Sequence, residues 1–179
     1  EMEKTEQLFL QILESALLDR PFSRCHEITE EQWQVIFRMA QNHKVLPLVY
    51  QAVYQAPALK NTEAIRAAVR KTVIIQAVKT GEFLELNQKL KDAGCEPVVV
   101  KGLVCRNLYP QPDLRVSADE DILIPANQFD RCRQILLAFG METDLPENRQ
   151  ETDYEVPFRK KDGALFVEVH KSLFPPESD

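Results

Sequence analysis

The sequence is short of basic residues, and this shortage excludes one class of protein. Its 22 Lys and Arg residues are outnumbered by 28 Asp and Glu residues, so the formal net charge at pH 7 is −6. A general binder of long nucleic acid needs a basic surface that replaces the counterions of the phosphates. We therefore do not expect long nucleic acid as a partner, although a local basic cleft stays compatible with this charge.

The sequence also lacks clustered cysteines and long apolar runs. Its four cysteines contain no C-x-x-C pair, so neither a zinc site nor a disulfide framework is expected, and the thiols should be reduced. No apolar run approaches the ~18 residues of a membrane span, and residues 1–6 are too acidic and polar for a signal peptide. We expect a cytoplasmic protein without a membrane partner. Because the chain starts without Met and stops just after an apolar strand, we also expect a fragment of a longer protein.

Residues 3 to about 93 show a helical pattern. Apolar residues recur at helical spacing from Leu8 to Leu17, a capping box at Thr29 opens a second helix, and Pro47 fits the first turn of a third. The longest helical segment runs from Thr62 to Ala93, with apolar positions at Ile65, Val69, Val73, Ala77, Leu84 and Leu90. This pattern predicts a helical bundle over residues 1–94.

The pattern changes abruptly at Gly94. Beyond this glycine the sequence predicts a buried strand at 97–100, a short helix at 102–108, a strand at 119–124, a helix from Pro125 capped by Gly140, and a hairpin whose strands cover 154–159 and 165–169. This order predicts an α+β fold, in which a small mixed β-sheet core with flanking helices comes after the helical bundle. The core would occupy residues 95–179.

Two carboxylates stand out in the second predicted strand. Alternate side chains of a strand share a face, so Asp119 and Asp121 should point the same way. Two parallel carboxylates repel each other unless a cation lies between them, and hard oxygen ligands suit Mg²⁺. The alternative is that residues 117–121 form an acidic loop without a metal.

Further polar residues lie at the ends of predicted strands. Glu168 and His170 should share one face of their strand, either at a solvent-exposed edge or beside the first two carboxylates. Lys101 and Gly102 lie where a strand feeds a helix, a natural position for an anion, although this pair has no Walker spacing and is also common in simple turns. Arg115 precedes the acidic pair, where it would contact either phosphate or a neighbouring Asp.

Taken together, these elements resemble a known family. The residues concerned are Val99 to Leu103, Leu108 to Pro110, Leu114 and Arg115, Asp119 to Ile124, and Val167 to His170. In this order they resemble the uncharacterised bacterial nucleotidyltransferase family of the polymerase-beta-like superfamily. One departure is Glu120, which stands where such strands have an apolar residue. Its side chain must face solvent or a partner, or the strand must be irregular.

The resemblance implies a role for each residue. Asp119, Asp121 and Glu168 are similar to the catalytic carboxylates that bind Mg²⁺ or Mn²⁺, and Lys101 with Gly102 is similar to the phosphate-binding turn. Arg115 and His170 resemble the arginine and the histidine of the family, which would also contact substrate. The family's Gly-Ser turn is not literally present. Its members are usually longer, so this core should lack a C-terminal part.

The expected reaction is transfer of a nucleoside monophosphate from a nucleoside triphosphate to an acceptor, with release of pyrophosphate. The acceptor would be a protein, a sugar or a small molecule. The sequence leaves two alternatives open. A non-catalytic binding or scaffolding module would keep the fold without binding metal, and a metal-dependent phosphohydrolase would consume nucleotide without any acceptor.

Overall fold

The computed structural model describes residues 2–57, 59 and 62–174. Its described residues divide into two compact units. The first contains residues up to Ile74 together with Arg106–Val116, and the second contains Ile75–Cys105 and the residues from Ser117 onward. The domain boundary at residue 94 stays a prediction.

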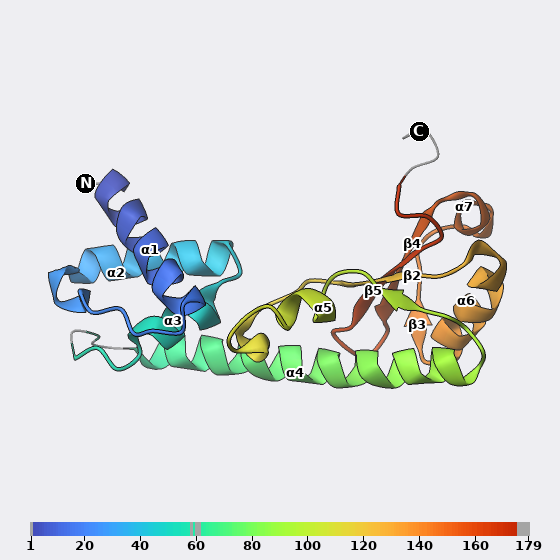
Figure 1. Ribbon diagram of the computed structural model, residues 1–179, viewed down its shortest axis with the longest axis horizontal. Helices are drawn as coiled ribbons and strands as arrows, with labels where there is room; N and C mark the ends of the chain where they lie inside the picture. The colour runs from blue at the N-terminus through green and yellow to red at the C-terminus, as the bar shows by residue number, and fades with distance from the viewer. Residues whose placement is uncertain (1, 58, 60–61, 175–179) are drawn as a thin grey trace. The chain divides into compact units, whose positions relative to one another are not determined.

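Helices make up the first unit (Figure 1). They are α1 (Met2–Leu17), α2 (Glu30–Asn42), α3 (Leu46–Val53) and the first part of α4 (Glu63–Asp92), with a 3₁₀ turn at Cys25–Glu27. The predicted capping box is present at the start of α2, because the Gln32 amide donates to Thr29 Oγ1 at 3.3 Å and the Thr29 amide to Gln32 Oε1 at 3.0 Å. The predicted apolar face of this helix is buried: Trp33, Ile36, Phe37 and Ala40.

A five-stranded mixed sheet forms the centre of the second unit, in the order β1-β2-β5-β4-β3. The strands are β1 (Val98–Val99), β2 (Glu120–Leu123), β3 (Met141–Glu142), β4 (Glu155–Lys160) and β5 (Phe166–His170). β2 and β5 run parallel, whereas the other neighbours are antiparallel. The predicted α+β fold, with N-terminal helices before a mixed sheet, is confirmed.

Helices cover one face of this sheet (Figure 1). The apolar residues of that face alternate along the strands, at Ile122 and Ile124, Val156 and Phe158, and Val167 and Val169. They pack against Phe83, Leu86 and Leu90 of α4 and against Phe129, Cys132 and Leu136 of α6 (Phe129–Ala138). Alternation therefore turns Asp121, Glu168 and His170 toward the opposite face.

Several local predictions were wrong. The strand at 97–100 is not buried, because β1 is a two-residue edge strand and Val98 is 57% exposed. The predicted short helix after Gly102 is present but shorter, as α5 (Leu103–Arg106), and 3₁₀ turns at Pro112–Leu114 and Ala126–Gln128, the latter just before α6, were not predicted. The sequence pattern also missed β3 and the polar helix α7 (Glu147–Thr152).

The buried face of α4 differs from the predicted one in the second unit. Its buried residues are Gln76, Lys79, Phe83, Leu86 and Leu90, whereas the predicted Leu84 is 49% exposed. Two polar side chains thus take positions that a purely apolar pattern cannot identify.

Candidate active site

The parallel pairing of β2 and β5 creates the acidic cluster of the second unit. Asp121 and Glu168 are direct register partners across these strands, so their side chains lie on the same face of the sheet. Glu168 lies two residues before His170 in β5, which places the imidazole beside both carboxylates. His170 Nε2 lies 3.0 Å from Asp121 Oδ1 and 4.0 Å from Glu168 Oε2.

These three side chains have the composition of a metal site. One ligand atom from each of Asp121, Glu168 and His170 lies within 4.8 Å of the other two. Asp121 is 2% exposed and His170 is 8% exposed, while Glu168 is partly exposed. Carboxylate oxygens suit Mg²⁺ and Mn²⁺, and neutral imidazole can add a nitrogen ligand. The donor set therefore fits the divalent cation that the resemblance implies.

The negative charge gathered around Glu168 is also compatible with a bound cation. Burial raises the pKa of its carboxyl, and the nearby carboxylates of Glu155, Asp119 and Asp121 raise this pKa further, while His170 opposes the shift. Asp119 lies one residue before β2 and is half-buried. The Asp119 carboxylate contributes to the raised pKa of Glu168. The group whose ligand atoms all lie within 4.8 Å of one another consists of Asp121, Glu168 and His170.

Lys101 brings a positive charge to this cluster. Its Nζ lies 3.5 Å from Asp121 Oδ1, and 65% of its side chain is exposed. Gly102 comes next, in a turn with a positive φ of 57°. Since the Lys101 side chain is largely exposed and its Nζ is adjacent to the cluster, an anionic ligand there could reach it.

Arg115 belongs to the first unit, unlike the other predicted site residues. Its guanidinium carbon lies 5.7 Å from the centre of the Tyr109 ring, in the arrangement of a cation–π contact. Its contact with substrate stays a prediction.

Comparison with known protein families identifies the family of the chain. A family model described as an uncharacterised nucleotidyltransferase matches residues 29–179, most of the chain and all of the acidic cluster. The chain belongs to this nucleotidyltransferase family. Comparisons with curated proteins and with solved structures gave no match.

The sequence did not single out Glu155, which lies beside the acidic cluster of this nucleotidyltransferase. It is the antiparallel register partner of His170, and its Oε2 lies 3.6 Å from His170 Nδ1. That nitrogen is buried and has no hydrogen-bond partner among the residues that the structure describes. The alternation of apolar Val156 and Phe158 in β4 places Glu155 on the face of the carboxylates, but only the strand order brings it next to His170.

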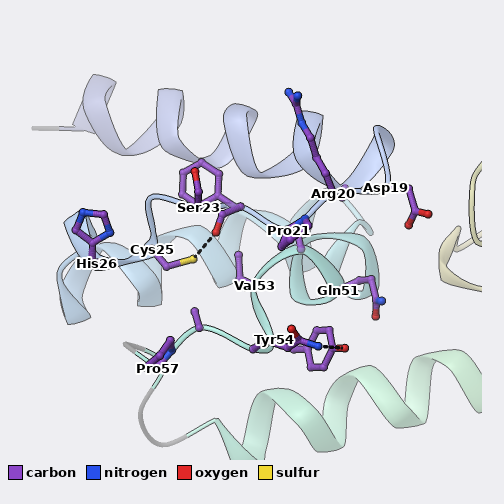
Figure 2. A pocket seen from close by; sticks show the side chains of 15 residues that line it. Asp19, Arg20, Pro21, Ser23, Cys25, His26, Gln51, Val53, Tyr54 and Pro57 are labelled. Atoms are coloured by element: carbon purple, nitrogen blue, oxygen red, sulfur yellow. Dashed lines mark hydrogen bonds between the residues drawn. The ribbon is translucent and has the colours of Figure 1, made fainter.

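A cavity of about 530 Å³ lies in the helical unit of this nucleotidyltransferase, separate from the predicted site residues. It is formed by the segment after α1 and by the end of α3, and Figure 2 shows Pro21, Cys25, Val53 and Tyr54 around it. Cys25 Sγ donates to the Phe22 carbonyl oxygen at 3.2 Å. None of the predicted site residues lines this cavity.

Two remaining features are the state of the cysteines and the length of the helices. All four cysteines are free, and burial, with Cys95 nearby, raises the pKa of Cys132 to about 12. Within the described ranges of the chain, the helices are too short or too polar to cross a membrane.

Proposed function

We propose that this chain transfers a nucleoside monophosphate from a nucleoside triphosphate to an acceptor and releases pyrophosphate, with the help of a divalent cation. The observation that carries this proposal is the convergence of Asp121, Glu168 and His170 across paired strands β2 and β5. Family membership supports the reaction class. Placement in the polymerase-beta-like superfamily belongs to the proposal as well.

Asp121 and Glu168 are the residues that would hold Mg²⁺ or Mn²⁺, with Asp119 beside them and His170 available as a nitrogen ligand or as a hydrogen-bond partner of Asp121. When bound, the cation polarises the reacting phosphoryl group and offsets its negative charge. Without a cation, burial and then the carboxylates of Glu155, Asp119 and Asp121 raise the pKa of Glu168, so a bound cation would favour its charged form.

The protein's own groups account for the remaining chemistry. A hydroxyl or amine of the acceptor forms a bond to the α-phosphorus, the bond from that phosphorus to the bridging oxygen breaks, and pyrophosphate leaves. Glu168 either completes the metal site or accepts the proton of the acceptor. The exposed ammonium of Lys101 offsets charge on the phosphates, the turn at Gly102 lies next to them, and Arg115 is a further candidate for such a contact.

The acceptor belongs to one of three classes: a protein side chain, a sugar or another small molecule. The charge of the chain disfavours long nucleic acid. Nucleotide binding alone would fit a non-catalytic module, and release of inorganic phosphate instead of pyrophosphate would fit a phosphohydrolase.

The test is calorimetric titration of MgATP and MnATP, and of the other nucleoside triphosphates, into the chain and two variants. Asp121→Asn removes a carboxylate charge from the cluster, while Asp162→Asn removes the same charge from the exposed hairpin turn. We expect metal-dependent binding to be weakened at least tenfold in the first variant and unchanged in the second. Equal binding by Asp121→Asn and the unaltered chain would refute the proposed site. A pyrophosphate assay with candidate acceptors then separates transfer from hydrolysis.

A further inference from the structure

Glu120 is a fully buried carboxylate in the strand that carries Asp121. It is 0% exposed, and alternation turns it toward the helix-covered face, away from the acidic cluster. Its Oε2 accepts a hydrogen bond from the Leu103 amide at 2.7 Å, and its Oε1 accepts one from Ser117 Oγ at 3.1 Å. One side chain thus connects β2 to the turn that contains Lys101 and Gly102.

Two buried side chains of α4 extend these contacts. Gln76 Oε1 accepts a hydrogen bond from the Ser117 amide at 3.1 Å, and Gln76 Nε2 donates to Ser117 Oγ at 3.4 Å. Lys79 Nζ donates to the carbonyl oxygens of Ser117 and Ala118, both at 2.8 Å. We call Gln76, Lys79, Ser117 and Glu120 the polar network.

The polar network holds the backbone immediately before Asp119. Residues 117–119 are not in a strand, so sheet hydrogen bonds do not fix them. A buried backbone group needs a partner, and the side chains of α4 supply these partners here. The direction in which Asp119 leaves this segment therefore depends on Gln76 and Lys79.

Gly102 lies directly against the carboxylate of Glu120, where a larger residue would not fit. A Cβ added at Gly102 would overlap Glu120 Oε2 and lie 2.7 Å from Glu120 Cδ. Its φ of 57° also favours glycine. The turn is therefore shaped around this carboxylate, and its neighbour Lys101 is held with its Nζ 3.5 Å from Asp121 Oδ1.

We propose that Glu120, supported by Ser117, Gln76 and Lys79, is a positioning residue of the nucleotidyltransferase site, which fixes the Lys101 turn relative to the Asp119 and Asp121 carboxylates. This inference rests on the proposed function. Glu120 itself faces away from the cluster and acts through the backbone of β2 and through the Leu103 amide. Groups that hydrogen-bond a metal ligand directly change metal affinity by about 10- to 100-fold when they are removed, so for Glu120, which acts one contact further away, we expect the lower end of this range.

The test compares Mn²⁺ affinity with thermal stability in the whole chain, measuring free Mn²⁺ by electron paramagnetic resonance. Glu120→Ala removes the hydrogen bonds to the Leu103 amide and to Ser117 Oγ, and we expect it to weaken Mn²⁺ binding about tenfold. Glu120→Gln keeps the shape, an acceptor for the Leu103 amide and a donor for Ser117 Oγ, so it should restore affinity to within about threefold.

Gln150→Ala is the matched control. Gln150 is also buried in the second unit, but its side chain bonds the Leu145 carbonyl oxygen, so its removal should lower the melting temperature and leave Mn²⁺ affinity unchanged. Ser117→Ala is a milder variant that deletes a single hydroxyl, for use if Glu120→Ala does not fold. We expect it to weaken Mn²⁺ binding several-fold with a melting temperature close to that of the unaltered chain.

The outcomes separate the two proposals. Binding by the unaltered chain, with the same affinity in folded Glu120→Ala or Ser117→Ala, would overturn the positioning role alone. A parallel loss of affinity in Gln150→Ala would overturn it as well, because general destabilisation would then explain the loss. Absence of Mn²⁺ binding by the unaltered chain would overturn the proposed function and the positioning role together.

Discussion

Substitution of Gly102 by alanine should destabilise the protein mainly through Glu120. The added Cβ would overlap Glu120 Oε2, lie 2.7 Å from Cδ of the same residue and approach the Asp119 carbonyl oxygen at 3.2 Å. Because Glu120 is fully buried and its Oε2 is bonded to the Leu103 amide, the carboxylate can move only by giving up this hydrogen bond.

Two costs add up in Gly102→Ala. An alanine with a φ of 57° costs roughly 1–2 kcal/mol relative to glycine, and a buried amide without its acceptor costs about 1–3 kcal/mol. The free energy of unfolding should therefore fall by about 2–5 kcal/mol, out of the roughly 5–15 kcal/mol that a domain has. In a Glu120→Ala background the overlap is gone and mainly the backbone cost remains.

Urea denaturation of the unaltered chain, both single variants and the double variant measures this coupling. We expect the effect of Gly102→Ala to shrink by about 1–3 kcal/mol when Glu120 is already alanine. Gly140→Ala is the control for the backbone term, since Gly140 has a φ of 84° and a Cβ there would meet no atom within 4 Å. Additivity of Gly102→Ala and Glu120→Ala within about 0.5 kcal/mol would refute the steric argument.

Two further predictions concern α4 and the acidic cluster. Gly81→Ala should raise the free energy of unfolding by about 0.5–1 kcal/mol, because Gly81 lies within α4 and its added Cβ meets nothing within 4 Å; urea denaturation checks this, and a loss of stability would contradict it. Glu168→Gln should stabilise the metal-free protein at pH 7. The raised pKa of Glu168 means that its neutral form stabilises the fold below about pH 4.5, and that this contribution is lost as the pH rises through the raised pKa. In EDTA, Glu168→Gln should therefore melt at a higher temperature than the unaltered chain at pH 7, and the two should melt at similar temperatures at pH 4. An equal difference in melting temperature at both pH values would show that the charge of Glu168 is not the cause.

Alternation within single strands was predictable from the sequence. It correctly placed Glu168 and His170 on one face of their strand, and it gave the hairpin formed by β4 and β5. The pairing of β2 with β5 was not predictable, because these strands lie far apart in the chain and their register depends on packing across the whole sheet. The proximity of Asp121, Glu168 and His170 results from that pairing.

Helix α4 shows why the polar network escaped sequence reasoning. A search for apolar residues at helical spacing assigns Gln76 and Lys79 to solvent, although both are buried and lie on the same face as Phe83. Lys and Gln are rarely buried unless they are paired. Their partners here include backbone groups of residues 117 and 118, and these partners can be identified only once the fold is known.

Glu120 and the polar pair on α4 explain each other physically. A carboxylate among apolar strand residues is costly to bury unless donors surround it, and the Leu103 amide and the Ser117 hydroxyl are such donors. Ser117 is in turn held by Gln76, and Lys79 holds the carbonyl oxygens that precede Asp119. An apolar side chain at position 120 would leave the Leu103 amide without this acceptor, and a side chain at position 102 would overlap the Glu120 carboxylate. The residue that looked least suited to its strand is thus the one that connects the strand to the turn beside the proposed site.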